Sequence, residues 1–273
     1  MYSISDLENR LVPSERMPVL FVGHGTPMNA IQDNEYSRTW TALGRELPKP
    51  QAIIVISAHW LTQGGTAITD APKNPIIYDF YGFPPELYNV KYDTKGDHDV
   101  AQLVAKQLLD DMERYEIALD HQWGLDHGTW SVLKWLSPHP SVPVLQISID
   151  YSLPLPKLYE LFTRLRRLRD HGVIFIGSGN IVHSLRAMRN DGATWDWAAE
   201  FDHIAQEAIE HRDLDVLLDP FTASPSARLS IPTDDHYRPL ITALSLLHPD
   251  EQLHYFNESI DLGSVSMRSF VTA

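Results

Sequence analysis

The chain has 273 residues, 43% of them hydrophobic, which is enough to bury the core of one large domain. It carries 22 basic and 36 acidic residues, a formal net charge of −14, so nucleic acid and anionic membrane surfaces are unfavourable partners. It contains no cysteine, which excludes disulfides, thiolate metal ligands and cysteine nucleophiles.

The N-terminal residues carry no recognisable targeting signal. The acidic residues Asp6 and Glu8 come early, and no apolar segment follows them. No apolar run in the chain is long enough to span a bilayer. We therefore expect a cytoplasmic protein with no membrane partner.

Four short apolar runs, at residues 17–22, 52–56, 142–149 and 173–176, predict buried strands. Helical patterns are found at residues 35–47, 99–114, 156–169, 195–210 and 234–247, and the tail from Gln252 predicts one or two further strands. Strands that alternate with helices favour an α/β fold. We expect a single-domain layered sandwich with a central, largely parallel sheet flanked by helices.

Two long stretches, residues 61–97 and 219–233, show no clear periodicity. Long loops in a compact domain often form lids or pocket walls, although they can also be plain surface loops. The first stretch is rich in aromatic residues, which either line a pocket or pack against each other: Tyr78, Phe80, Tyr81 and Phe83.

Three histidines follow the ends of predicted strands. His24 comes directly after the first strand, His59 after the second, and His183 shortly after the strand at residues 173–176. Ligands of open α/β sheets bind outside the carboxyl ends of the strands. If these strands are parallel neighbours, the three imidazoles converge, and imidazole suits Zn, Fe, Cu and Ni. The pattern favours a metal or catalytic cluster over three unrelated histidines.

Two further histidines lie in distinctive contexts. His236 is expected in the first turn of a helix capped by Thr233 or Asp234, where a solvent-facing side chain is the simpler interpretation. His127 lies among glycines and tryptophans, in a segment that forms either a pocket wall or a self-packed turn. The preceding Asp126 could orient a histidine, as carboxylates near metal sites often do.

Together these segments resemble the class III extradiol ring-cleavage dioxygenases, the LigB-like superfamily, and within it the DOPA 4,5-dioxygenase-like branch. The segments that carry the resemblance are GHGTPMN at residues 23–29, SAHW at 57–60, WGLDHGTW at 123–130, GNIVHSL at 179–185 and PTDDHY at 232–237. Each segment is weak alone, but their combination is specific. We expect residues 1–16 to be an N-terminal extension and residues 17–273 to be one extradiol dioxygenase-like catalytic domain.

The resemblance implies an enzyme with one divalent metal per chain that opens a catechol such as DOPA with O2 to give a semialdehyde. It implies that His24, His59 and His236 are metal ligands. It implies that His183 is either a catalytic acid/base or a further ligand, and that His127 is a pocket histidine that contacts substrate or dioxygen.

The identity of the metal stays open at this point. Many extradiol enzymes use two histidines and a carboxylate, which suits Fe(II), whereas three histidines also match a zinc site. Asp234 and Asp235 lie close to His236 in sequence and could serve as ligands instead. The competing functions are a zinc-dependent hydrolase and a non-enzymatic binding protein on the same fold. The oligomeric state is not indicated by the sequence.

Overall fold

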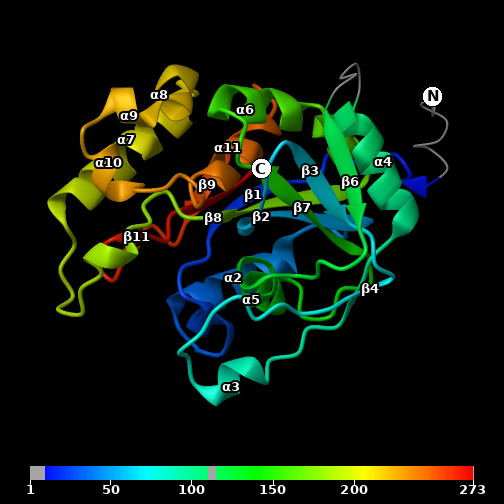
Figure 1. Ribbon diagram of the computed structural model, residues 1–273, viewed down its shortest axis with the longest axis horizontal. Coiled ribbons are helices and arrows are strands. Elements are labelled where there is room, and N and C mark those ends of the chain that lie inside the picture. The colour runs from blue at the N-terminus through cyan, green and yellow to red at the C-terminus, as the bar shows by residue number, and fades with distance from the viewer. Residues whose placement is uncertain (1–9, 110–114, 273) are drawn as a thin grey trace.

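The computed structural model describes residues 10–109 and 115–272. Within these ranges an eight-stranded sheet runs through the middle of the molecule, in the order β6-β3-β7-β2-β8-β1-β12-β9 (Figure 1). Its strands are β1 (Val19–Gly23), β2 (Ala52–Thr62), β3 (Gly65–Thr69), β6 (Glu116–Asp120), β7 (Val144–Asp150), β8 (Val173–Gly179), β9 (Leu253–Phe256) and β12 (Ser269–Thr272). Two small pairs lie outside it, β4 (Lys73–Asn74) with β5 (Thr94–Lys95) and β10 (Ile260–Asp261) with β11 (Val265–Ser266).

The middle of the sheet is parallel. Strands β7, β2, β8 and β1 run in the same direction, whereas β12 and β9 add an antiparallel edge beside β1. At the other edge β3 is antiparallel to β7 and parallel to β6. The expected α/β class with a largely parallel central sheet is therefore confirmed, and the tail does supply the strands predicted for it.

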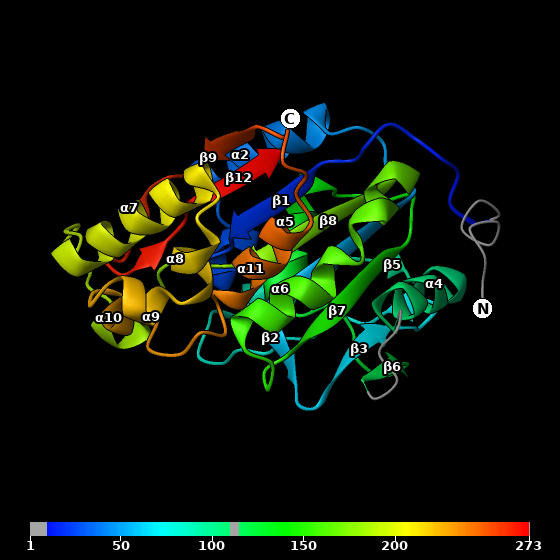
Figure 2. The ribbon, with the colours of Figure 1, turned by 90° about the horizontal axis from the view of Figure 1, so that it is seen from above.

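Helices cover both faces of the sheet. They are α2 (Glu35–Glu46), α3 (Pro85–Tyr88), α4 (His98–Leu109), α5 (His127–Leu136), α6 (Leu155–Thr163), α7 (Asp196–His211), α8 (Leu214–Leu218), α9 (Pro220–Ala223), α10 (Ala227–Ser230) and α11 (Arg238–Ser245), with 3-10 turns η1 (Pro27–Ala30), η2 (Arg166–His171) and η3 (Leu185–Ala187). In Figure 1, α6 and α11 lie above the sheet and α2 and α5 below it. Figure 2 shows α7 to α10 grouped at one end of the sheet.

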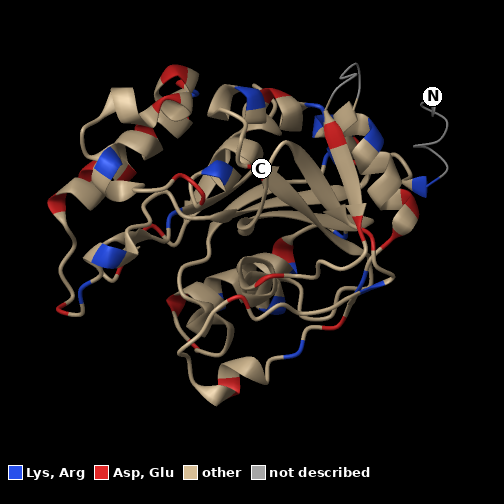
Figure 3. Ribbon diagram, in the orientation of Figure 1, with Lys and Arg blue, Asp and Glu red and all other residues tan. Residues whose placement is uncertain are grey.

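Side chains along the central strands point alternately to the two faces of the sheet, so the hydrophobic core forms two clusters, one on each face. In β1, Val19 and Phe21 pack into the cluster under α6 and α11, whereas Leu20 and Val22 pack into the cluster with α2 and α5. All four side chains are fully buried, and each such burial contributes about 1.5–3 kcal/mol. Charged side chains lie mainly on helices and loops rather than on these strands (Figure 3).

The structure corrects several expected elements. The stretch at residues 61–97 is not irregular throughout, because β2 continues to Thr62 and turns at Gly64, which has a φ of +79°, into β3. The stretch at residues 219–233 contains the short helices α9 and α10. Helix α5 was not expected, because its glycine and tryptophans obscure the helical pattern.

The expected helices are found with different bounds. Helix α4 ends at Leu109 among the described residues, and the rest of its expected range, residues 110–114, lies outside them. The helix expected at residues 156–169 is divided into α6 and η2. In the part of the chain that the structure describes, no helix is both long and apolar enough to cross a membrane.

Candidate metal centre

The carboxyl ends of β1 and β8 meet at one edge of the sheet, next to the middle of β2. Gly23 pairs with Gly179, and Ser57 of β2 pairs with Ser178 of β8, so the residues that follow these pairs start side by side. The His24 amide donates a hydrogen bond of 3.1 Å to the Gly179 carbonyl, which continues the ladder by one residue. His24 is thereby fixed at the edge where ligands of α/β folds bind.

His59 is presented by an irregularity in β2. Between Ile56 and Leu61 the strand advances five residues while its partner β7 advances two, from Ile147 to Ile149. The extra residues bulge out of the ladder, and His59 lies in this bulge. Bulges re-aim side chains next to functional sites.

His236 arrives from a distant segment, the turn before α11. The helix begins at Arg238 with no side-chain cap, so the expectation that His236 lies in its first turn, capped by Thr233 or Asp234, is wrong. The turn is held instead by the Asn180 amide, which donates to the His236 carbonyl at 2.9 Å. A Cβ at Gly179 would lie 2.2 Å from that carbonyl oxygen, so the close approach requires glycine at this position.

These elements bring three imidazoles together. The Nε2 atoms of His24 and His59 lie 3.1 Å apart. The His236 ring centroid lies 5.3 Å from that of His24 and 4.9 Å from that of His59. One nitrogen of each ring lies within 4.8 Å of one nitrogen of the others, a spacing that could hold one metal ion.

The surroundings keep these rings neutral. Burial, followed by the charge of neighbouring imidazoles, holds the pKa of His24 and His236 well below the usual value of 6.5. Burial and the charge of His127 lower the pKa of His59 to about 3, although Asp79 opposes the shift. Neutral imidazole is the form that binds metals.

A hydrogen bond fixes the proton of His24 on Nδ1, and a nearby charge favours the same position in His59. Ser178 Oγ donates to the Gly128 carbonyl at 2.5 Å, so it accepts from His24 Nδ1, which lies 3.0 Å away. His59 Nδ1 lies 3.3 Å from a carboxylate oxygen of Asp79. With the His59 proton on Nδ1, towards this charge, both Nε2 atoms present lone pairs that a shared cation would stabilise. The donor set therefore fits a bound metal ion.

Two carboxylates adjoin His236 in sequence but differ in their partners. His236 Nδ1 lies 2.6 Å from Asp235 Oδ2. The other Asp235 oxygen is buried and has no hydrogen-bond partner among the described residues. Asp234 forms an ion pair of 2.9 Å with Arg238. Asp235 is thus the carboxylate next to the imidazole cluster, and Asp234 is engaged with α11.

His183 lies beside this group and not within it. It follows β8, and its amide donates to the Ser230 carbonyl at 2.8 Å. Its ring stacks on that of His236, with centroids 3.4 Å apart and planes inclined by 11°. Burial is the largest cause that lowers the pKa of His183, to about 4, against the charge of Asp235.

His127 is held by a residue that the sequence did not single out, Asp79. The two oxygens of Asp79 accept from the His127 amide and from His127 Nδ1, each at 2.9 Å. The His127 ring lies 3.9 Å from that of His59, between centroids. Asp79 lies in the aromatic-rich stretch at residues 61–97, and only that general location indicated a functional segment.

Asp126 does not orient a histidine, contrary to expectation. It caps α5 by accepting from the Thr129 amide at 3.1 Å, and it accepts from Ser57 Oγ at 2.7 Å and from Gln146. Its side chain is fully buried, and burial, followed by the charge of Asp79, raises its pKa to about 6. Its interaction links α5 to β2 and β7.

Comparison with known proteins identifies the fold family. Residues 18–265 match the family described as the catalytic LigB subunit of aromatic ring-opening dioxygenase. The chain belongs to this family.

Proteins with similar sequences support the assignment to this family. The chain is 39% identical to a 4,5-DOPA dioxygenase extradiol of Escherichia coli, over 95% of this chain and 96% of the relative, and 34% identical to one of Beta vulgaris, over 92% and 94%. A crystal structure of an uncharacterized Escherichia coli protein superposes with a TM-score of 0.81 at 35% identity, and covers 94% of this chain and all of the other. This LigB-family chain is therefore an oxidoreductase of the extradiol ring-opening type.

The aromatic residues of the stretch at residues 61–97 divide into packing and exposed positions. Phe80 contacts the His127 ring edge-on at 5.6 Å between centroids, and it packs against Phe83 at 5.3 Å. The hydroxyl of Tyr78 donates to the Val90 carbonyl, which ties the segment to itself. Tyr81 is 92% exposed and packs against none of these rings. Phe80 is thus the aromatic side chain of this set that reaches the site.

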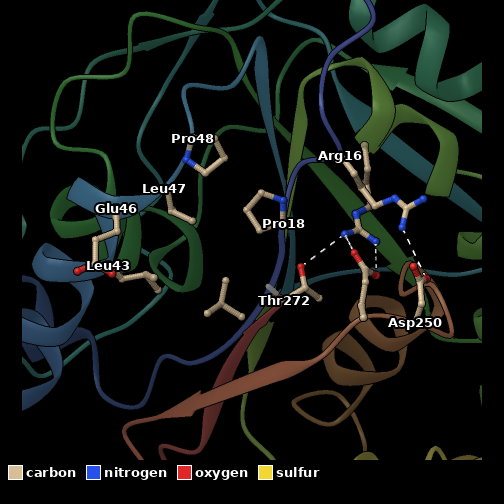
Figure 4. A pocket seen from close by; sticks show the side chains of 11 residues that line it. Arg16, Pro18, Leu43, Glu46, Leu47, Pro48, Asp250 and Thr272 are labelled. Atoms are coloured by element: carbon tan, nitrogen blue, oxygen red, sulfur yellow. Dashed lines mark hydrogen bonds and ion pairs between the residues drawn. The ribbon is translucent and has the colours of Figure 1, made fainter.

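A cavity of about 420 Å³ lies away from the histidines, at the amino-terminal end of β1 (Figure 4). Its lining includes Arg16, Pro18 and Thr272, and four of its charged side chains form ion pairs with each other. Arg16 pairs with Asp250 at 3.7 Å, and the buried Arg169 pairs with Glu251. The histidine cluster and this cavity are therefore separate features.

The pKa of Asp126 predicts a pH-dependent stability. Because its pKa is about 6 in the folded chain and 3.8 ordinarily, the folded state binds more protons between these values. The free energy of unfolding should therefore fall by about 2 kcal/mol from this group as the pH rises from 4 to 7. In Asp126→Asn this component should be absent, as measured by urea unfolding across that range. Asp215→Asn, at an exposed position, should retain the wild-type slope, and an unchanged slope in Asp126→Asn would contradict the assignment.

Proposed function

We propose that this chain opens the ring of a catechol such as DOPA with O2, beside one of the vicinal hydroxyls, to give a semialdehyde. The observation that carries the proposal is the set of buried, neutral imidazoles with facing nitrogens in a LigB-family fold. The names of the relatives support DOPA as the substrate, because several are 4,5-DOPA dioxygenases. The same names favour an oxygenase over a zinc hydrolase or a binding protein.

We propose His24, His59 and His236 as the residues that hold one divalent metal. A bound Fe(II) would supply the redox chemistry for activation of O2, which Zn(II) cannot supply because it has no accessible redox change. The chain itself contributes neutral nitrogens, whose protons are fixed on the outer side of the rings by Ser178 and Asp235.

His183 is proposed as the catalytic acid/base. Its pKa of about 4 leaves the ring neutral at physiological pH, so it can accept a proton from a catechol hydroxyl. Its stacked position against His236 supports a place beside the ligand set, whereas a role as a further ligand is the alternative.

His127 is proposed to contact substrate or dioxygen. Its Nδ1 is bound to Asp79, which leaves Nε2 available. An unprotonated Nε2 held in this way is an acceptor, so it can contact a hydroxyl group of the substrate.

Oxygen uptake tests the proposed reaction. The chain reconstituted anaerobically with Fe(II) should consume O2 stoichiometrically with DOPA or another catechol and form a yellow ring-opened product. The zinc-loaded chain should consume none, because zinc lacks the redox step. Absence of uptake from verified Fe(II)-loaded chain, or turnover of a hydrolysable substrate by the zinc form without O2, would reject the proposed oxygenase.

Removal of two proposed ligands tests the site. The double variant His24→Ala, His59→Ala should lose stoichiometric metal, because it removes two of the three proposed ligands. The measurement is elemental analysis after dialysis. His203→Ala, a change at a 66%-exposed side chain, should retain wild-type stoichiometry. Retention of metal by the double variant would place the ion elsewhere.

His183→Ala separates the two proposed roles of His183. Loss of an acid/base should lower catechol turnover by roughly 100-fold or more while metal content stays stoichiometric. Steady-state kinetics and metal analysis on the same sample give both quantities. Loss of metal together with turnover would make His183 a ligand, and unchanged turnover would remove it from the mechanism.

A further inference from the structure

Asp79 occupies a position shared by the histidine cluster and the aromatic-rich segment. Its side chain is 17% exposed, and it lies between Tyr78 and Phe80. Both of its oxygens accept hydrogen bonds from His127, one from the amide and one from Nδ1.

One oxygen completes the amino-terminal end of α5. Asp79 Oδ1 accepts from the His127 amide, whereas Asp126 accepts from the Thr129 amide two residues further along. The first amides of a helix lack partners within it, and the helix dipole favours negative charge there. This contact fixes the position of the Asp79 carboxylate relative to the ring of His127.

The other oxygen is shared by two imidazoles. Asp79 Oδ2 lies 2.9 Å from His127 Nδ1 and 3.3 Å from His59 Nδ1. A carboxylate only accepts, so the hydrogen bond to His127 requires hydrogen on its Nδ1. His59 Nδ1 lies beside the same oxygen without a hydrogen bond, and the negative charge of Asp79 favours hydrogen on that nitrogen as well. Ser178 and Asp235 each act on one ring of the cluster, whereas Asp79 acts on two.

We propose that Asp79 is a positioning residue that sets the tautomer of His127 through a hydrogen bond and favours the same tautomer of His59 through its charge. It thereby couples a proposed metal ligand to the histidine proposed to meet substrate or dioxygen. The consequence for turnover rests on the proposed function, but the consequence for the two rings does not.

The contact also ties the aromatic segment to the site. Phe80, the next residue, packs edge-on against His127 and at 6.1 Å against Trp130 of α5. Movement of this segment would withdraw the carboxylate from both rings. The position of Phe80 and the protonation of the imidazoles are thus linked through one side chain.

Imidazole nitrogen NMR on the full chain loaded with zinc, a diamagnetic probe, tests the proposal directly. In the wild type, both His59 and His127 should carry hydrogen on Nδ1, with assignments from His59→Gln and His127→Gln. Protonation of His127 at Nε2 in the wild type would overturn the proposal, and this result needs no variant of Asp79.

Asp79→Asn is the informative variant, because it keeps the size of the side chain but can present an N–H where the carboxylate accepts. His127 should then shift towards the Nε2-protonated form, and zinc affinity in a chelator competition should fall by about 10–100-fold. Asp93→Asn is the matched control, since Asp93 lies in the same stretch, is 81% exposed and pairs with Lys73. It should leave both quantities unchanged. An unaltered tautomer and zinc affinity in Asp79→Asn would reject the proposal.

Turnover adds a separate comparison. If the Fe(II)-loaded wild type opens catechols, Asp79→Asn should lower kcat more than it raises KM, because Asp79 acts through His59 and His127. If the wild type opens none, the proposed function fails, while the NMR and zinc measurements still decide the role of Asp79.

Discussion

The Nε2 atoms of His24 and His59 face each other at 3.1 Å in a buried site, and this contact constrains the structure around it. Two protonated rings at that distance would repel by about 5 kcal/mol at an effective dielectric constant of 20. The rings must therefore be neutral. The proton of His24 lies on Nδ1, which donates to Ser178, and the charge of Asp79 favours the corresponding nitrogen of His59. Groups outside the two rings thus help to determine the inner contact.

Three different local structures bring His24, His59 and His236 together at the edge of the sheet. His24 extends the ladder of β1, whereas His59 leaves the ladder of β2 through a bulge. His236 is delivered by a turn whose carbonyl lies close to Gly179, where a side chain would not fit. Parallel strands alone would leave the three segments too regular for their rings to meet. The bulge and the glycine are local departures that convert adjacent strand ends into one site.

The sequence predicted the parts of this arrangement that depend on strand ends. His24, His59 and His183 follow apolar runs that do form parallel neighbours, so the α/β reasoning located them. The interpretation of His236 depended on family resemblance, because its turn reaches the cluster only through tertiary contacts. The sequence did not point to Asp79, because its partners are 20 and 48 residues away, in β2 and α5. No local sequence pattern indicates contacts over such distances. The boundary expected between residues 16 and 17 stays a prediction, as does the cytoplasmic location.

The placement of the carboxylates explains how a chain of net charge −14 can present a site suited to an anion. Asp79 and Asp235 lie behind the imidazoles, against their Nδ1 atoms, rather than among the facing nitrogens. A facial triad would instead place one negative charge directly on the ion. With the proposed ligand set, the charge of a divalent ion is balanced only from behind the rings. In the proposed reaction, an ion held there would attract the ionised oxygens of a catechol, although the distant field of the chain repels them.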